Sequence, residues 1–192
     1  MPSHIHIGFE EMTKAMKGVK ALQHLAEHHG IPNIFTDNGG KLVQILVATG
    51  LDYVEGRTGP DAQDRLGNFY EIKSTDVNAK VGFGTSHHLN MSILDRYRVH
   101  TFIFAIFDGV TLLEAYRVRT EDLEPLFQQW EDRLFDTDHL NNPKIPLALV
   151  REVGDIVYFK DVPAPWTPGK RRRTKPYKYA ELVKMGLINK AA

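Results

Sequence analysis

The chain has 192 residues, no cysteine, and equal numbers of basic and acidic residues, 24 of each, so its formal net charge is zero. This length predicts one main domain, and the absence of cysteine excludes disulfide bonds and any site that uses a thiolate ligand or a thiol nucleophile. No apolar run approaches the length of a membrane span, and the N-terminal residues lack the apolar stretch of a signal peptide. We therefore expect a cytoplasmic protein that has no membrane partner.

The charge is unevenly distributed along the chain. Residues 159–192 contain nine Lys or Arg and two Asp or Glu, a net charge of +7, which leaves −7 on residues 1–158. The basic residues concentrate at Lys170-Arg171-Arg172-Arg173, directly after a segment rich in proline. This pattern predicts a folded domain over 1–158 and a basic, proline-containing extension over 159–192. The extension would either follow phosphate groups or remain a solvated terminus.

Hydrophobic periodicity and turn residues predict the elements in chain order. We expect helices over 10–29 and 39–49, strands over 53–55 and 69–74, a loop over 76–85, a short helix over 89–98, strands over 101–107 and 112–118, a helix over 120–134 capped by Thr120, a short helix over 145–152, a strand over 156–159 and a last helix within 179–189. The run 101–107 is apolar throughout, which is typical of a central strand buried on both faces. The fold class is therefore α/β, with a mixed α+β sheet flanked by helices.

One charged pattern stands out in the middle of the chain. Asp61 follows Gly59-Pro60, and after a gap of nine residues comes Glu71-Ile72-Lys73. Side chains alternate along a strand, so Glu71 and Lys73 share one face, and a turn within 65–68 would carry Asp61 back beside them. Two carboxylates and an ammonium at one point are typical of Mg²⁺-dependent nucleases. The alternative is a surface strand with solvated charges.

A histidine pair follows this strand. His87 and His88 lie between Ser86 and Leu89-Asn90. Adjacent histidines point in different directions on most backbones, so zinc binding is the weaker interpretation. In a nuclease these side chains would contact base edges or phosphates, and otherwise they would lie in an exposed loop.

The order and spacing of several longer blocks resemble the PvuII family of type II restriction endonucleases, within the PD-(D/E)xK nuclease superfamily. The resemblance runs from about residue 22 to residue 158. Its strongest blocks are Asp37-Asn38-Gly39-Gly40-Lys41-Leu42, Thr49-Gly50-Leu51, Gly56-Arg57, Asp61-Ala62, Tyr70-Glu71-Ile72-Lys73-Ser74, Phe104-Ala105-Ile106 and Asn141-Asn142-Pro143-Lys144-Ile145-Pro146.

The resemblance implies a restriction-endonuclease-like fold and a catalytic site. Asp61 and Glu71 would be metal ligands, together with the backbone carbonyl of Ile72, and the metal would be Mg²⁺. Lys73 would be the third catalytic side chain, and Tyr97 would approach the reacting phosphate. The reaction would leave 5′-phosphates.

The resemblance also implies the partners. The enzyme would be a homodimer around duplex DNA, with N-terminal helices in its interface, and would cut the palindrome CAGCTG bluntly. A cognate DNA methyltransferase would protect the host's own sites. The expected DNA-binding residues are Asp37 near the minor groove, His87, His88 and Asn141 in the major groove, Asn142 beside them, and Gly84 and Ser86 in the histidine-bearing loop.

Two departures from the family pattern lie in that loop. Gly84 stands where the family has a serine, and Ser86 where it has a third histidine. They bear on the recognition sequence more than on the chemistry. Three other hypotheses remain from the sequence: a repair or junction nuclease without sequence preference, a DNA-binding relative without catalysis, and a structural protein.

Overall fold

A mixed sheet forms the centre of the molecule. The computed structural model describes residues 8–56, 59–79, 82–161 and 177–189. Within these ranges six strands form one sheet in the order β1-β2-β3-β5-β6-β8, in which β3 and β5 are parallel and the other neighbours are antiparallel. The strands are β1 (Asp52–Tyr53), β2 (Ala62–Gln63), β3 (Phe69–Asp76), β5 (Thr101–Asp108), β6 (Thr111–Val118) and β8 (Asp155–Phe159). The α/β class with a mixed sheet is confirmed.

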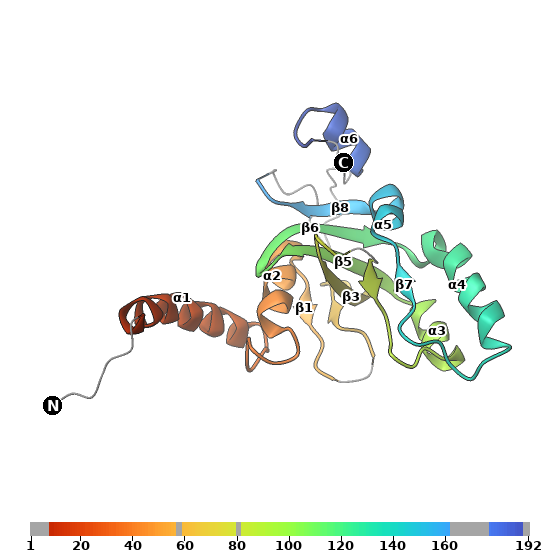
Figure 1. Ribbon diagram of the computed structural model, residues 1–192, viewed down its shortest axis with the longest axis horizontal. Coiled ribbons are helices and arrows are strands. Elements are labelled where there is room, and N and C mark those ends of the chain that lie inside the picture. Colours follow the sequence, from red (N-terminus) through yellow and green to blue (C-terminus); the bar gives the residue numbers. More distant parts are fainter. Residues whose placement is uncertain (1–7, 57–58, 80–81, 162–176, 190–192) are drawn as a thin grey trace.

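Helices cover the sheet and extend from one end of it (Figure 1). They are α1 (Phe9–His28), α2 (Gly39–Thr49), α3 (Met91–Tyr97), α4 (Thr120–Leu134), α5 (Leu147–Val153) and α6 (Tyr179–Lys184). In Figure 1, α1 reaches away from the body on one side, α3 and α4 lie at the opposite end, and α5 and α6 lie beside β8.

The central strand β5 packs against both layers, as its apolar sequence predicts. Its alternate side chains Phe102, Phe104 and Ile106 belong to one core cluster, which also contains buried residues of α3 and α4. Ile103 and Ala105 belong to a second cluster with buried residues of α2. All five side chains are fully buried. Because successive residues of a strand point to opposite faces, β5 joins two cores that would otherwise be separate.

Three details differ from the sequence prediction. The expected loop over 76–85 ends in a short strand, β4 (Phe83–Gly84), which pairs antiparallel with β7 (Lys144–Ile145), so the helix expected from residue 145 begins at Leu147. Thr120 is the first residue of α4 and not its cap. Its hydroxyl donates instead to the carbonyl oxygen of His100, 2.5 Å away, which ties the start of α4 to the loop between α3 and β5.

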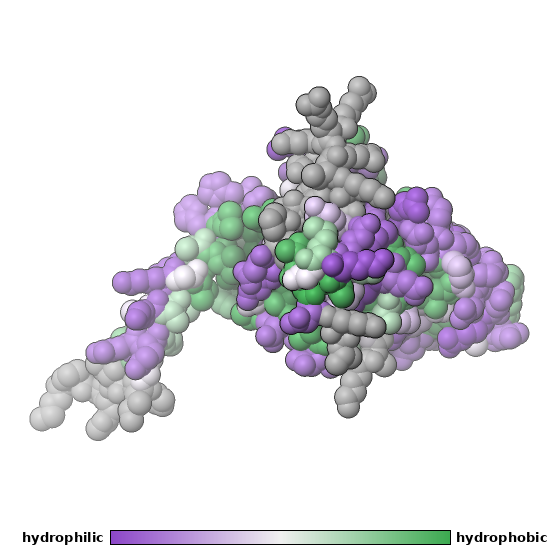
Figure 2. All heavy atoms as spheres, turned by 90° about the horizontal axis from the view of Figure 1, so that it is seen from above, coloured by the Kyte–Doolittle hydropathy of each residue, from purple (hydrophilic) through white to green (hydrophobic). Residues whose placement is uncertain are grey.

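An apolar hollow lies between α1, the loop that follows it and the β5–β6 turn. It is lined by Val19 and Leu22 of α1, by Ile34 and Phe35 of the following loop, and by Val110 of the β5–β6 turn. Phe35 and Val110 are 75% and 81% exposed, and hydrophobic patches are visible toward this end in Figure 2. None of the described helices is both long and apolar enough to cross a bilayer.

The C-terminal residues 177–189 pack on the body of the molecule. Leu182 of α6 is fully buried in the same core cluster as Phe102 and Trp130. The amide of Ile156 in β8 donates to the carbonyl of Tyr177 at 2.8 Å, and the Lys178 ammonium lies 2.7 Å from Asp155. The basic run at Lys170–Arg173 lies outside the described residues.

Candidate active site

The β2–β3 hairpin places Asp61 beside β3. The Asp61 amide donates to the Tyr70 carbonyl at 2.9 Å, and the Asp61 carboxylate accepts from the Ile72 amide at 2.6 Å. The turn between the two strands brings residues eleven positions apart into direct contact. The structure thus brings Asp61 to the strand of Glu71 and Lys73, as the spacing of the motif predicts.

Asp64, which the sequence reasoning did not single out, builds this turn. Its carboxylate accepts from the amides of Leu66 and Asn68 and from the hydroxyl of Tyr70. Burial favours the protonated acid, but these hydrogen bonds, from Asn68 above all, outweigh it and lower the pKa of Asp64. Asp64 is therefore ionised, and its hydrogen bonds hold the turn that positions Asp61 beside β3. An Asx turn before Gly67 is a local signal from which it could have been found.

Glu71 and Lys73 lie on the same face of β3. The Lys73 ammonium is 2.5 Å from the Glu71 carboxylate and 5.4 Å from the centre of the Tyr97 ring. Burial alone would lower the pKa of Lys73, but the charge and hydrogen bond of Glu71, together with the effects of Tyr97 and Asp61, outweigh it and raise the pKa. Lys73 therefore stays cationic and can meet an anion at neutral pH.

The surroundings of Asp61 favour its neutral, protonated form. Burial, followed by the nearby charge of Glu71, raises the pKa of Asp61 to about 6, against the opposing effects of the Ile72 amide and Lys73. Two carboxylates held this closely favour a cation between them. Within the described residues no third Asp, Glu, His or Cys joins them, so a metal here would rely on backbone or substrate oxygens for further ligands. The Ile72 side chain packs on the second core cluster, so only its backbone could take part.

The pH dependence of stability tests this assignment. A carboxyl group whose pKa rises from 3.8 to about 6 on folding stabilises the folded state fully below pH 3.8, where both states are protonated. Its contribution falls between those pH values and is lost above about 6, a loss of about 3 kcal/mol. We expect urea unfolding in EDTA to show this fall, and an Asp61→Asn variant to lack it. If the free energy of unfolding changed with pH equally in both proteins, the raised pKa of Asp61 would be contradicted.

A hollow of about 250 Å³ opens over these side chains. Asp61, Glu71, Lys73 and Tyr97 all line it, so the four expected catalytic residues share one space. Its further lining residues are Gly59, Ser86, Ile93, Arg96 and His100. Arg96 and His100 were missed because neither belongs to a motif. Asp61 also lines a second hollow together with Asp37, Asn38 and Ser74.

Asp37 enters this second hollow from a tight loop before α2. Asp37 and Asn38 both have positive φ, 47° and 61°, and the following Gly39 has no room for a Cβ because the Asn33 carbonyl oxygen would lie 2.4 Å from it. Asp37 is exposed and lies on the opposite side of Asp61 from Tyr97. The structure therefore places it near Asp61, at the edge that leads toward the apolar hollow.

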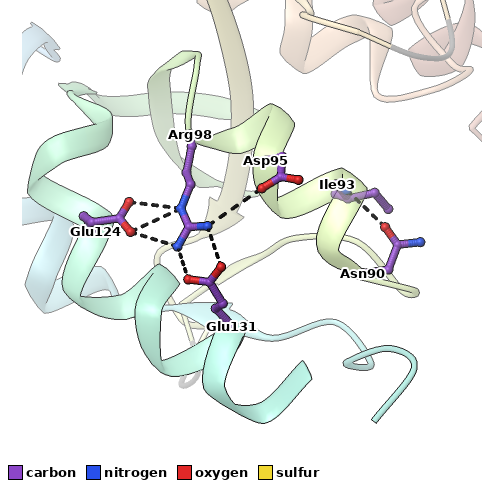
Figure 3. Close-up of polar contacts among 6 residues, drawn as sticks. All are labelled: Asn90, Ile93, Asp95, Arg98, Glu124 and Glu131. Carbon is purple, nitrogen blue, oxygen red and sulfur yellow. Dashed lines mark hydrogen bonds and ion pairs between the residues drawn. The ribbon is translucent and has the colours of Figure 1, made fainter. Parts of the chain in front are cut away.

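Helix α3 carries Tyr97 and is fixed at both ends (Figure 3). At its start, the Asn90 side chain accepts from the Ile93 amide at 3.0 Å, an N-terminal cap. At its end, the Arg98 guanidinium donates to Glu124 and Glu131 of α4, with N–O distances of 2.8 to 3.2 Å. Burial raises the pKa of Tyr97 above its usual value despite the Lys73 charge, so its hydroxyl keeps its proton.

Loss of the Arg98 contacts should loosen α3. Arg98→Ala leaves Glu131, which is 19% exposed, without its bidentate partner, and we expect a loss of about 2 kcal/mol in the free energy of unfolding. Arg119 provides the control, because its pair with Asp122 is exposed, and Arg119→Ala should change the free energy of unfolding far less than Arg98→Ala. Urea denaturation of both variants makes the comparison. Equal losses would show that the two α4 contacts do not hold α3.

The histidine-bearing loop forms a ribbon with the segment before α5. β4 pairs with β7, the Asn142 amide donates to the Ser86 carbonyl at 2.9 Å, and the Asn142 side chain accepts from the Thr85 amide at 2.9 Å. Gly84 lies against this contact, since a Cβ there would be 3.1 Å from the Asn142 oxygen. Asn142 therefore holds the ribbon together, whereas His87, His88 and Asn141 are exposed.

The fold and this site define a nuclease with a restriction-endonuclease-like architecture. The sheet presents a hairpin-borne carboxylate, a Glu-x-Lys strand and an adjacent polar ribbon. The family model of the restriction endonuclease PvuII matches residues 8–158. The chain belongs to this family, and it is a DNA-binding restriction endonuclease, a site-specific deoxyribonuclease.

Proposed function

We propose that this protein is a homodimer that cuts both strands of duplex DNA at a short palindrome, CAGCTG, leaving blunt ends and 5′-phosphates. The observation that carries the proposal is the convergence of Asp61, Glu71 and Lys73 in one hollow, with Asp61 and Glu71 close enough to raise the pKa of Asp61. The ribbon supplies the polar groups for reading bases, because a two-stranded β-ribbon fits the major groove.

In this mechanism, Asp61, Glu71 and the Ile72 carbonyl would hold Mg²⁺, which would neutralise phosphate charge and make a bound water molecule more acidic. Lys73 donates to the attacking water or to a phosphate oxygen and stabilises the charge that develops on the phosphate. Water attacks phosphorus in line and loses a proton to solvent, the P–O3′ bond breaks, and the departing 3′-oxygen takes up a proton from solvent. Tyr97 donates its hydroxyl proton in a hydrogen bond to a phosphate oxygen without being ionised.

The charge of the hollow supports a phosphate substrate. Lys73 and Arg96 together balance Asp61 and Glu71, and a bound divalent cation would leave the site positive. In the described residues no hydrogen bond or ion pair engages the Arg96 side chain, unlike that of Arg98. Arg96 is thus free to bind a phosphate group of the strand being cut.

The dimer is supported by the apolar hollow beside α1. Phe35 and Val110 are exposed there, and a single copy leaves them in water. A two-fold dimer also matches a palindromic site, because each copy would read one half-site and cut one strand. Asp37, which lines the hollow between Asp61 and α2, would then face the minor groove near the subunit junction. A methyltransferase that modifies the same sequence would complete the system.

Digestion of a fully sequenced DNA of phage length tests the proposal. With Mg²⁺ we expect discrete fragments whose ends map to CAGCTG, and none with EDTA. Discrete fragments that map to another sequence would preserve the activity and overturn the recognition sequence. A smear, or nicking at branched structures alone, would point to a nuclease without sequence preference.

A further inference from the structure

The face of the ribbon that carries the histidines is fixed by a buried leucine pair. The amide of Leu89 donates to the Leu140 carbonyl at 3.0 Å, and the amide of Leu140 donates back at 2.8 Å. Both leucine side chains lie in the core, with exposures of 0% and 5%. Their sequence neighbours His88 and His139 are both exposed, so these two imidazole rings lie on the outer surface of the ribbon.

The two histidines meet on this face although 51 positions separate them in the sequence. Their ring centroids are 4.9 Å apart and the ring planes are inclined at 58°. Asn141, which follows Leu140, is exposed like both histidines. His88 and His139 thus form one ring pair on the surface of the ribbon, and the exposed Asn141 is two residues from His139 in the sequence.

Among the described residues, no hydrogen bond or ion pair engages the side chain of His139 or of Asn141. Asn142 differs, because its side-chain oxygen is used by the Thr85 amide. A metal site is the weaker interpretation, because no third Asp, Glu, His or Cys of the described residues joins the histidine pair.

We propose that His139 is a specificity-determining residue that contacts a base edge in the major groove beside His88. This inference rests on the proposed function, because it deepens the account of how the ribbon reads DNA. An imidazole N–H donates one hydrogen bond, and the N7 and O6 atoms of purines are the acceptors that the major groove presents. The ring contact also fixes the angle at which His88 enters the groove.

Three variants distinguish a contact of His139 with a DNA base from mere packing of its ring against His88. His139→Ala removes both the ring and its N–H group, His139→Phe keeps a ring of similar size without the N–H group, and Thr137→Ala is the control in the same exposed segment. For each protein, kcat/KM is measured on the cleaved duplex and on duplexes that differ from it by one symmetric base change. We expect the ratio between these duplexes to fall about tenfold for His139→Ala and His139→Phe and to stay unchanged for Thr137→Ala.

Other results would overturn the inference in distinguishable ways. If the unaltered protein cuts but both His139 variants keep its ratios, His139 does not read DNA and the proposed nuclease stands. If His139→Phe restores full discrimination, the ring only supports His88. If the unaltered protein does not cut duplex DNA, the proposed function fails and this inference fails with it. Circular dichroism verifies folding, and His139→Phe decides the question should His139→Ala fail to fold.

Discussion

Replacing Asp61 by asparagine should reduce DNA cleavage by at least about a thousandfold while the protein remains folded. Asparagine keeps an oxygen that can accept from the Ile72 amide, so the local hydrogen bond at 2.6 Å survives. The variant loses a charge that faces Glu71, which the raised pKa of Asp61 identifies as costly in the protein alone. Loss of activity without loss of stability would therefore mark Asp61 as a residue retained for chemistry.

The control is another aspartate of the same sheet. Asp52 lies on β1 opposite Gln63, is exposed, and lines neither hollow beside Asp61. Asp52→Asn changes the net charge by the same amount and should leave the cleavage rate within about twofold, because exposed charges contribute little. Single-turnover cleavage of a plasmid with one site measures both variants. An Asp61→Asn protein as active as Asp52→Asn would overturn the assignment of the active site.

The second large effect concerns the C-terminal helix. Leu182 is fully buried in the core that also contains Phe102 and Trp130, so Leu182→Ala should cost about 3 kcal/mol in the free energy of unfolding. For a chain of this size, that loss lowers Tm by about 10 °C. Residues 177–189, which lie beyond the family match, would then be part of the stable folded unit.

Leu187 is the matched control for Leu182. It lies in the same segment but is 47% exposed, and Leu187→Ala should change the free energy of unfolding by less than about 1 kcal/mol. Thermal unfolding followed by circular dichroism compares the two variants. If both lose little, then residues 177–189 only rest on the surface and the core does not depend on them.

The sequence predicts best those parts of the molecule whose structure depends on residues that are close together in the chain. Helices α1, α2 and α4 have long apolar periodicities, and β5 is apolar throughout, so their bounds agree with the prediction within about two residues. The Asp61–Glu71 approach is also local, because one hairpin turn creates it. Chain neighbours alone suffice to predict such features.

The ribbon could not be predicted in this way. β4 and β7 have two residues each and exist only because Phe83 and Ile145 pair across 62 positions of sequence. No local sequence pattern predicts a strand of two residues. The contact of His88 with His139 could not be predicted either, because the two residues are also far apart in the sequence. Arg96 and His100 were missed for a related reason, since only the packing of α3 against β3 brings them to the hollow.

The contact between Ile156 and Tyr177 also limits how copies of the protein can associate. A free strand edge is a template on which another chain can add a strand, and this is a common route to aggregation. At β8 that edge is occupied at Ile156 by the backbone of the same chain, and at the other side of the sheet β1 has only two residues. Among the described residues, β1 is thus a short edge and β8 is an edge that is partly covered. Ordered assembly is therefore left to side-chain surfaces, which can bring two copies together without growing into a fibre.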